Sequence, residues 1–284
     1  MKARLVAGAI AACLLLVCAG RTQATTWGPK EVACPICQTR NTLQVPMSYG
    51  SYIYRWPSKY QYIFWPSTDR MVLHCCQKCG LTCFMWDFPN VPKEKHEEVK
   101  RALAGVSYTF KDGEYYKAPM SERLAAAEKV YEVLNKDDDE FWCMFYRVAG
   151  YHLEEGSAEK AAEARKKALE LAEKMLKEKD NKPVRKELLL ISGAMRHLLK
   201  DDRGALTDFD AAKALKYQVR EKDLAALKKA AEDPDPKKAE EAKKKLAELE
   251  EGVRDKDRYL TELLDDYVKK LRSPQTSTAP AGKE

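Results

Sequence analysis

The chain has 284 residues, enough for two modest domains or for one domain with a helical extension. Hydrophobic residues make up 45% and charged residues 33%, which supports a packed core and excludes wholesale disorder. The net charge of +6 argues against a strongly basic nucleic-acid binder, and the mean hydropathy of −0.56, without a long apolar run, excludes a polytopic membrane protein.

Residues 1–24 have the layout of a secretory signal peptide. Lys2 and Arg4 form a basic start, and Leu5–Ala19 is an apolar run shorter than the roughly 20 residues that span a bilayer. Small residues up to Ala24 then offer a cleavage site. Cleavage there removes three basic residues and no acidic one, so the net charge falls from +6 to +3. We therefore expect an exported protein, periplasmic or extracellular.

Two alternatives to cleavage stay open. The apolar run could remain as an uncleaved membrane anchor, or a cysteine within it, Cys13 or Cys18, could carry a lipid. In the lipid-anchored case the protein would sit at the cell envelope. After cleavage, seven of the nine cysteines remain.

The rest of the chain divides by composition. Residues 25–114 hold 14 of the 26 aromatic residues and read as short strands and turns, punctuated by Pro, Gly and Ser. Residues 115–272 are densely charged and read as consecutive helices. Residues 273–284 form a polar tail that we expect to be disordered.

Two C-x-x-C pairs lie in the aromatic-rich part, separated by 38 residues. Two residues between thiolates let one tight turn aim both sulfurs at one ion, and two such turns complete a tetrahedral site. Gly80, directly after the second pair, suits the positive φ that closes such a turn. Because four thiolates leave no open position, we predict one structural Zn²⁺. The predicted ligands are Cys34, Cys37, Cys76 and Cys79.

Other uses of these cysteines stay open. An exported protein can form disulfides, and a C-x-x-C pair can be a redox site. Cys75 could replace Cys76 as a ligand, and His74 could be a substitute ligand, although a strand residue is the simpler interpretation of His74. We expect Cys83 and Cys143 to be buried small hydrophobes.

Eight of the 17 residues from 49 to 65 are aromatic. They could form a stacking platform for sugar, peptide or bases, with Tyr52, Tyr54 and Trp56 as partner-binding residues. The favoured interpretation is that these rings supply the core of a small β domain that lacks aliphatic bulk.

Helix signals fill the second part. Ser157 is a predicted N-cap after the terminating Gly156, and Asp235 is a predicted N-cap with Pro236 in the first turn. Helices are expected over 121–134, 141–153, 158–179, 188–199, 204–215, 239–249 and 259–271.

The helix pairs resemble tetratricopeptide repeats. The first match consists of Phe145, Val148, Ala149, Gly156, Ala161 and Ala168, and the second, 44 residues later, of Leu189, Gly193, Ala205, Phe209 and Ala212. The usual period is about 34 residues, so the resemblance implies a helix extension, and a generic helical bundle stays open. His152 and Arg165 stand where aromatic residues are usual. The resemblance implies a groove lined by the first helix of each pair, at Tyr146, Gly150, Leu153, Leu190, Ala194 and His197.

Residues 30–215 resemble the bacterial domain-of-unknown-function 2225 family. The resemblance lies in the two C-x-x-C pairs, Asp87-Phe88 and the repeat-like helices that follow. That family usually has Gly where this chain has Gln38, and many of its members look cytosolic. The resemblance implies an α+β fold, a small zinc-ribbon-like β head over 25–114 followed by an all-α tetratricopeptide-like domain over 115–272, and it brings no established reaction.

No catalytic constellation is visible. The four histidines form no H-E-x-x-H motif, and P-loop, G-x-S-x-G and dinucleotide-binding patterns are absent from the sequence. We therefore expect a non-enzymatic scaffold that binds a protein or peptide through its helical groove or aromatic-rich head. A thiol-redox or metal-dependent enzyme is the first alternative. A zinc-ribbon nucleic-acid binder is the second, against which the low charge and the export signal argue.

Overall fold

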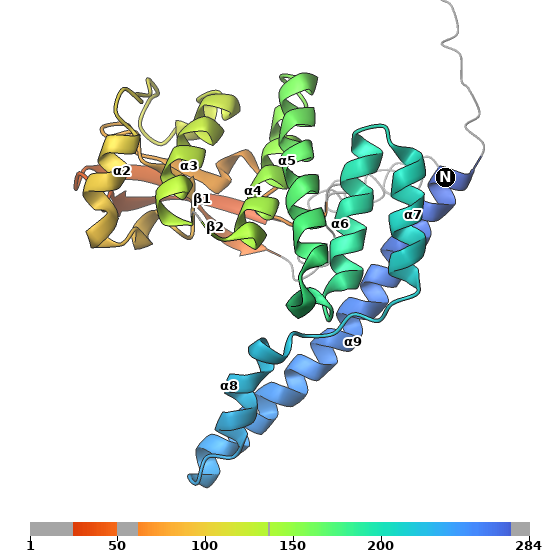
Figure 1. Ribbon diagram of the computed structural model, residues 1–284. Helices are drawn as coiled ribbons and strands as arrows, with labels where there is room; N and C mark the ends of the chain where they lie inside the picture. The colour runs from red at the N-terminus through yellow and green to blue at the C-terminus, as the bar shows by residue number, and fades with distance from the viewer. Residues whose placement is uncertain (1–24, 50–61, 136, 274–284) are drawn as a thin grey trace, which may run out of the picture.

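The computed structural model describes residues 25–49, 62–135 and 137–273. These residues form a mixed α+β structure, with a small β region at the N-terminal end followed by helices, as predicted. Figure 1 shows the β region and α2–α4 at one end, α5–α7 beside them, and a long blue helix, α9, that crosses behind α7 and projects beyond the body together with α8.

The β region consists of two antiparallel strand pairs. Strand β1 (Thr25–Ala33) pairs with β2 (Arg40–Tyr49), and β3 (Leu73–Cys75) pairs with β4 (Thr82–Phe84). The last partners before the first turn are Ala33 and Arg40, and those before the second are Cys75 and Thr82. Each C-x-x-C pair therefore lies in the turn that connects the two strands of a hairpin.

Six helices build the body. They are α2 (His96–Ala102), α3 (Met120–Leu134), α4 (Asp139–Leu153), α5 (Ala158–Lys177), α6 (Arg185–Leu198) and α7 (Asp202–Lys213), with short 3-10 helices between elements. Side-chain oxygens cap three of them: Asp138 accepts from the Phe141 N–H, Ser157 from Lys160, and Asp201 from Gly204. The N-cap predicted at Ser157 is confirmed, and each cap satisfies a backbone donor that the helix leaves free.

Glycine residues allow close packing within two helix pairs, α4 with α5 and α6 with α7. A Cβ on Gly150 of α4 would lie 2.9 Å from Cγ of Arg165 on α5. A Cβ on Gly193 of α6 would lie 2.7 Å from Cδ1 of Phe209 on α7. Real side chains do not approach so closely, so glycine at these positions sets the distance between paired helices.

Two helices near the C-terminus differ from the prediction. Residues 239–249 and 259–271 were expected to be separate helices, but both belong to α9 (Pro236–Arg272), which is 37 residues long. Gly252 does not interrupt the helix, because it is exposed and a side chain there would meet no neighbour. The predicted cap is confirmed, since the Asp235 carboxylate accepts from the Lys237 N–H. Helix α8 (Glu221–Ala231) was not predicted.

Helices α8 and α9 form an arm outside the body. The described side chains of α8 are all at least partly exposed, and Ala242 is the one buried residue in the first 24 residues of α9. The C-terminal part of α9 differs, because Leu260, Leu264, Tyr267 and Val268 are buried against the other helices. Among the described helices, none has the length and apolar character needed to span a membrane.

Two clusters of buried residues make up the core. The first joins the two hairpins to α2, α3 and α4, so it continues past the predicted domain boundary at residue 114. Its centre is aromatic: Phe84 of β4 packs against Tyr131 of α3 and Phe145 of α4. The second cluster lies among α5, α6, α7 and the C-terminal half of α9.

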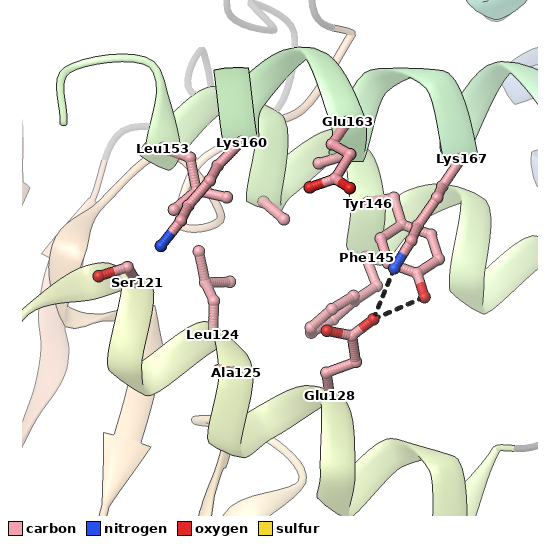
Figure 2. A pocket seen from close by; sticks show the side chains of 12 residues that line it. Ser121, Leu124, Ala125, Glu128, Phe145, Tyr146, Leu153, Lys160, Glu163 and Lys167 are labelled. Atoms are coloured by element: carbon pink, nitrogen blue, oxygen red, sulfur yellow. Dashed lines mark hydrogen bonds and ion pairs between the residues drawn. The ribbon is translucent and has the colours of Figure 1, made fainter. Parts of the chain in front are cut away.

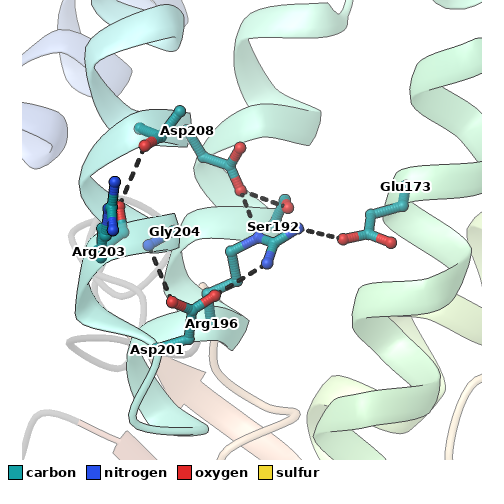
Figure 3. Close-up of polar contacts among 8 residues, drawn as sticks. Glu173, Ser192, Arg196, Asp201, Arg203, Gly204 and Asp208 are labelled. Carbon is teal, nitrogen blue, oxygen red and sulfur yellow. Dashed lines mark hydrogen bonds and ion pairs between the residues drawn. The ribbon is translucent and has the colours of Figure 1, made fainter.

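A polar cluster ties three helices together beside the second core (Figure 3). Arg196 of α6 forms an ion pair with Glu173 of α5, contacts Asp208 of α7 at 3.0 Å and contacts Asp201 at 2.9 Å. The Ser192 hydroxyl also donates to Asp208, at 2.6 Å. These charge-assisted contacts fix the register of α6 against both neighbours.

Candidate functional site

The four predicted ligands lie together. Sγ of Cys34 is 3.6 Å from Sγ of Cys79, and Sγ of Cys37 is 3.5 Å from Sγ of Cys76. All four sulfur atoms lie within 4.8 Å of one another, an arrangement that could hold one metal ion. The shortest sulfur contacts thus join the two C-x-x-C pairs to each other. All seven cysteines in the described part of the chain have free thiols.

The two C-x-x-C turns have the same backbone hydrogen bonds. In the first turn, Cys34 N–H donates to the Thr39 carbonyl and Gln38 N–H donates to the Cys34 carbonyl, both at 2.9 Å. In the second, Cys76 N–H donates to the Leu81 carbonyl at 2.8 Å, and Gly80 N–H donates to the Cys76 carbonyl at 3.0 Å. Two equivalent turns therefore present their sulfurs to one centre from opposite sides.

The residue after each pair has a positive φ. Gly80 has φ of 72°, as predicted, and Gln38 has φ of 61° at the equivalent place in the first turn. Gln38, which stands where the family usually has glycine, therefore leaves the turn geometry unchanged. Its backbone is strained, because a residue with a Cβ is unfavourable in the left-handed region. The Gln38 amide nitrogen donates to the Pro35 carbonyl at 3.0 Å and supports that conformation.

The cysteine cluster favours a bound cation. Hydrogen bonds from the Cys34 and Cys79 thiols hold the pKa of Cys76 far below its ordinary value. The hydrogen bond to Cys76 in turn raises the pKa of Cys34 far above its ordinary value, because it stabilises the protonated thiol. Four thiolates at these distances would repel one another, so they can coexist when a cation lies between them.

The neighbouring His74 and Cys75 lie outside the cluster. His74 lies on β3, as its simpler interpretation predicted, and its Nε2 contacts the Gln44 carbonyl at 3.0 Å. Burial lowers the pKa of His74 to about 4. Cys75 is fully buried, and burial raises its pKa to about 12. The sulfur cluster includes Cys76 and excludes Cys75 and His74.

The remaining cysteines are buried small side chains, as expected. Cys83 and Cys143 are 0% and 1% exposed, and burial raises the pKa of both thiols. A neutral, enclosed thiol is a poor nucleophile.

The aromatic segment is described in part. Tyr52, Tyr54 and Trp56 lie outside the described residues. Tyr62 is buried in the second core cluster, and its hydroxyl donates to Glu187 of α6 at 2.9 Å. Trp65 packs against Trp27 of β1, with 5.6 Å between ring centroids. The described rings of this segment therefore have structural contacts.

The expected groove surface needs correction at three positions. Leu190 and Ala194 are 0% exposed, and Gly150 is buried against α5, so none of the three can contact a partner in this conformation. The reason is that α5 and α7 cover the faces of α4 and α6 on which these residues lie. His197 is partly exposed and its Nδ1 lies 2.6 Å from an Asp202 carboxylate oxygen.

Tyr146 and Leu153, the other two expected groove residues, line a pocket between α3 and α5 (Figure 2). The pocket has a volume of about 200 Å³, and its apolar wall includes Leu124 and Phe145. A second pocket of about 380 Å³ shares Ser121, Leu153 and Lys160 with the first, so the two pockets adjoin.

Charged residues that sequence reasoning missed line the first pocket. Lys160, Glu163 and Lys167 are spaced three and four residues apart on α5, a spacing that places them on one helix face. Lys167 donates to Glu128 at 3.1 Å, and the Tyr146 hydroxyl donates to the same carboxylate at 2.8 Å. Figure 2 shows this Glu128–Tyr146–Lys167 group at one end and Lys160 at the other.

Comparisons of the chain with protein-family models, with curated proteins and with solved structures gave no match. Any assignment of function therefore rests on the geometry of this chain.

Proposed function

We propose that this protein is an exported, non-enzymatic interaction protein whose β head is stabilised by one structural Zn²⁺ and whose helical groove binds a protein or peptide partner. The observation that carries the proposal is that residues of the sulfur cluster and residues of an open groove belong to the same buried core cluster. The groove runs between α3 and α5, helices that pack with α4 on the head.

The donor set supports zinc. Zn–S bonds of about 2.3 Å in a tetrahedron give sulfur–sulfur edges of about 3.8 Å. The edges of 3.5 and 3.6 Å and the upper limit of 4.8 Å bracket that value. Four sulfur ligands favour zinc over the oxygen-seeking ions Mg²⁺ and Ca²⁺. The ion would join two hairpins that no strand ladder connects, which is a structural role.

The groove supports a peptide partner. Its wall offers apolar contacts at Leu124 and Leu153, and its rim carries both signs of charge. Among the described residues, Lys160 and Glu163 of this rim have no side-chain ion pair with the protein. A peptide with an apolar side chain between charged neighbours would contact the apolar wall and pair with the charged rim. Peptide sites lined by helices commonly combine these two kinds of contact. One helix pair that lines the groove, α4 and α5, carries the first match to the tetratricopeptide pattern.

Metal analysis tests the zinc part. We expect one zinc per purified chain, and we expect Cys34→Ser and Cys79→Ser to lose the metal and the fold of the head, since a structural zinc site contributes on the order of 10 kcal/mol. Cys143→Ser is the matched control, because Cys143 is a buried thiol outside the cluster. Full zinc and native circular dichroism in Cys34→Ser and Cys79→Ser would refute this part.

A peptide-library selection tests the groove. Ala125 lines the pocket and is exposed, so Ala125→Glu obstructs the groove without removing a core side chain. The control is Ala211→Glu, which adds the same exposed side chain to α7, away from the groove. We expect peptides enriched on the wild type to lose affinity at least tenfold for Ala125→Glu alone. Equal binding by both variants would place the partner elsewhere.

The second candidate function is thiol-redox chemistry. Cys37 and Cys79 are partly exposed, which gives an oxidant access to one sulfur of each pair. Purified protein without metal, in which Cys34 and Cys37 cycle between a disulfide and two thiols, would favour this alternative over the zinc proposal.

A further inference from the structure

A polar pocket lies where α4, α5, α6 and α9 meet the segment that precedes α8. It has a volume of about 330 Å³ and is separate from both the sulfur cluster and the groove. Three cations line it: Arg147 of α4, Arg220 at the start of α8 and Lys256 of α9. Two carboxylates, Glu140 and Glu187, line it as well, so the wall has one surplus positive charge.

The surplus charge belongs to Arg147. This residue is 9% exposed, and its Nε and Nη1 donate to the carbonyls of Cys143 and Tyr62 at 3.3 and 2.6 Å. Its guanidinium also lies 5.7 Å from the centroid of the Tyr62 ring. Within the described part of the chain it has no carboxylate partner, and residues 50–61 contain no Asp or Glu. A buried charge without a counter-ion is costly.

Arg123 shows what a purely structural buried arginine looks like in this chain. It is also fully buried without an ion pair among the described residues, but its Nε, Nη1 and Nη2 all donate to backbone carbonyls. Arg147 uses Nε and Nη1 in this way, and among the described residues its Nη2 has no hydrogen-bond partner. Every guanidinium nitrogen of Arg123 therefore donates to a carbonyl, whereas Nη2 of Arg147 keeps both of its N–H groups available toward the pocket.

A second donor is unused on the same wall. Nε of Arg220 is buried and has no hydrogen-bond partner, although its guanidinium forms an ion pair with Glu140. Lys256 is occupied by Glu187 at 2.8 Å and by the Tyr217 hydroxyl at 3.1 Å. The opposite wall is apolar and includes Leu188 and Ile191.

We propose that this pocket binds a small organic monocarboxylate. The carboxylate would accept from Arg147, whose planar fork matches its geometry, and the apolar part would lie against Leu188 and Ile191. A single negative charge balances the one surplus positive charge of the wall, whereas a phosphate dianion would leave a buried excess. The volume lies at the lower end of small-molecule sites, so the ligand is compact.

Calorimetry and thermal unfolding of the full chain test the proposal, with benzoate, butyrate and inorganic phosphate as probes against chloride at equal ionic strength. We expect saturable binding of benzoate or butyrate and a raised melting temperature. Arg147→Gln should weaken the affinity at least tenfold. Arg203→Gln, which removes an exposed arginine of α7, should leave it unchanged.

A second variant and a measurement on the wild type test the same site. Ile191→Phe fills the pocket without changing its charge and should also abolish binding. In the wild type, benzoate should shift the Nε–H nuclear magnetic resonance signals of two arginines, Arg147 and Arg220. Absence of stabilisation beyond chloride, equal affinity in Arg147→Gln, or stronger binding of phosphate than of both carboxylates would each overturn the proposal.

Discussion

The most specific prediction concerns the residue that follows each C-x-x-C pair. Gly80 has a φ of +72°, and a Cβ there would lie 2.9 Å from the Val106 carbonyl oxygen and 3.0 Å from Val106 Cγ1. Left-handed backbone costs a residue with a Cβ roughly 1–2 kcal/mol, and displacing packed atoms costs about 1–3 kcal/mol more. The lower entropy of the unfolded alanine chain returns roughly 0.4–1 kcal/mol. We therefore expect Gly80→Ala to lower the free energy of unfolding by roughly 1–4.6 kcal/mol.

Gln38 provides an internal control, because it occupies the equivalent place in the first turn with φ of 61°. Gln38→Ala keeps a Cβ that is already present and loses one exposed hydrogen bond, worth about 0.5 kcal/mol. Urea denaturation of the metal-loaded protein, followed by circular dichroism at pH 7, measures both variants. If Gly80→Ala lies within about 0.5 kcal/mol of Gln38→Ala, the reasoning from φ and from the Val106 contact is wrong.

Three further predictions follow from buried contacts. Burial lowers the pKa of His152 to about 4. Between pH 6.5 and 5 the unfolded state therefore binds a proton at His152 that the folded state does not bind. The free energy of unfolding should fall by about 2 kcal/mol over this range because of His152. His152→Gln should remove this contribution and leave the similar one of His74, whose pKa burial also lowers to about 4, and an unchanged slope would contradict the assignment. Gly193→Ala should cost about 1–2 kcal/mol, since overpacking against Phe209 exceeds the gain in helix propensity, and Phe209→Leu in the same chain should recover most of the loss. In hydrogen exchange, amides of residues 240–252 should exchange faster than those of 260–268, because the former lie on the exposed arm; equal protection would indicate that the arm is covered.

Local signals in the sequence predicted much of the fold. Ser157, Asp235 and Pro236 are positions where side-chain chemistry alone specifies a helix start, and the structure has helices starting there. The clustering of Cys34, Cys37, Cys76 and Cys79 was predicted for the same reason, because the C-x-x-C spacing constrains a turn directly.

What sequence reasoning missed depends on tertiary packing. The helical repeat pattern indicated which residues share a face of α4 or α6, but whether that face meets solvent depends on α5 and α7. Leu190 and Ala194 were therefore assigned to a surface that is in fact covered. Likewise, the charges that line the groove come from α3 and α5, helices that face each other across the pocket. The helices expected over 239–249 and 259–271 are one helix, in which the exposed Gly252 costs only about 1 kcal/mol.

Helix α9 makes the arm and the body one mechanical unit. Its 37 residues give a rod of about 55 Å, whose far end pairs with α8 and whose near end buries Leu260, Leu264 and Tyr267. The helix runs uninterrupted through Gly252, so α9 has no hinge between the tip of the arm and the body. The torque of a load applied at the tip is therefore delivered to the second core, where Tyr267 stacks on Phe209 with 4.7 Å between ring centroids.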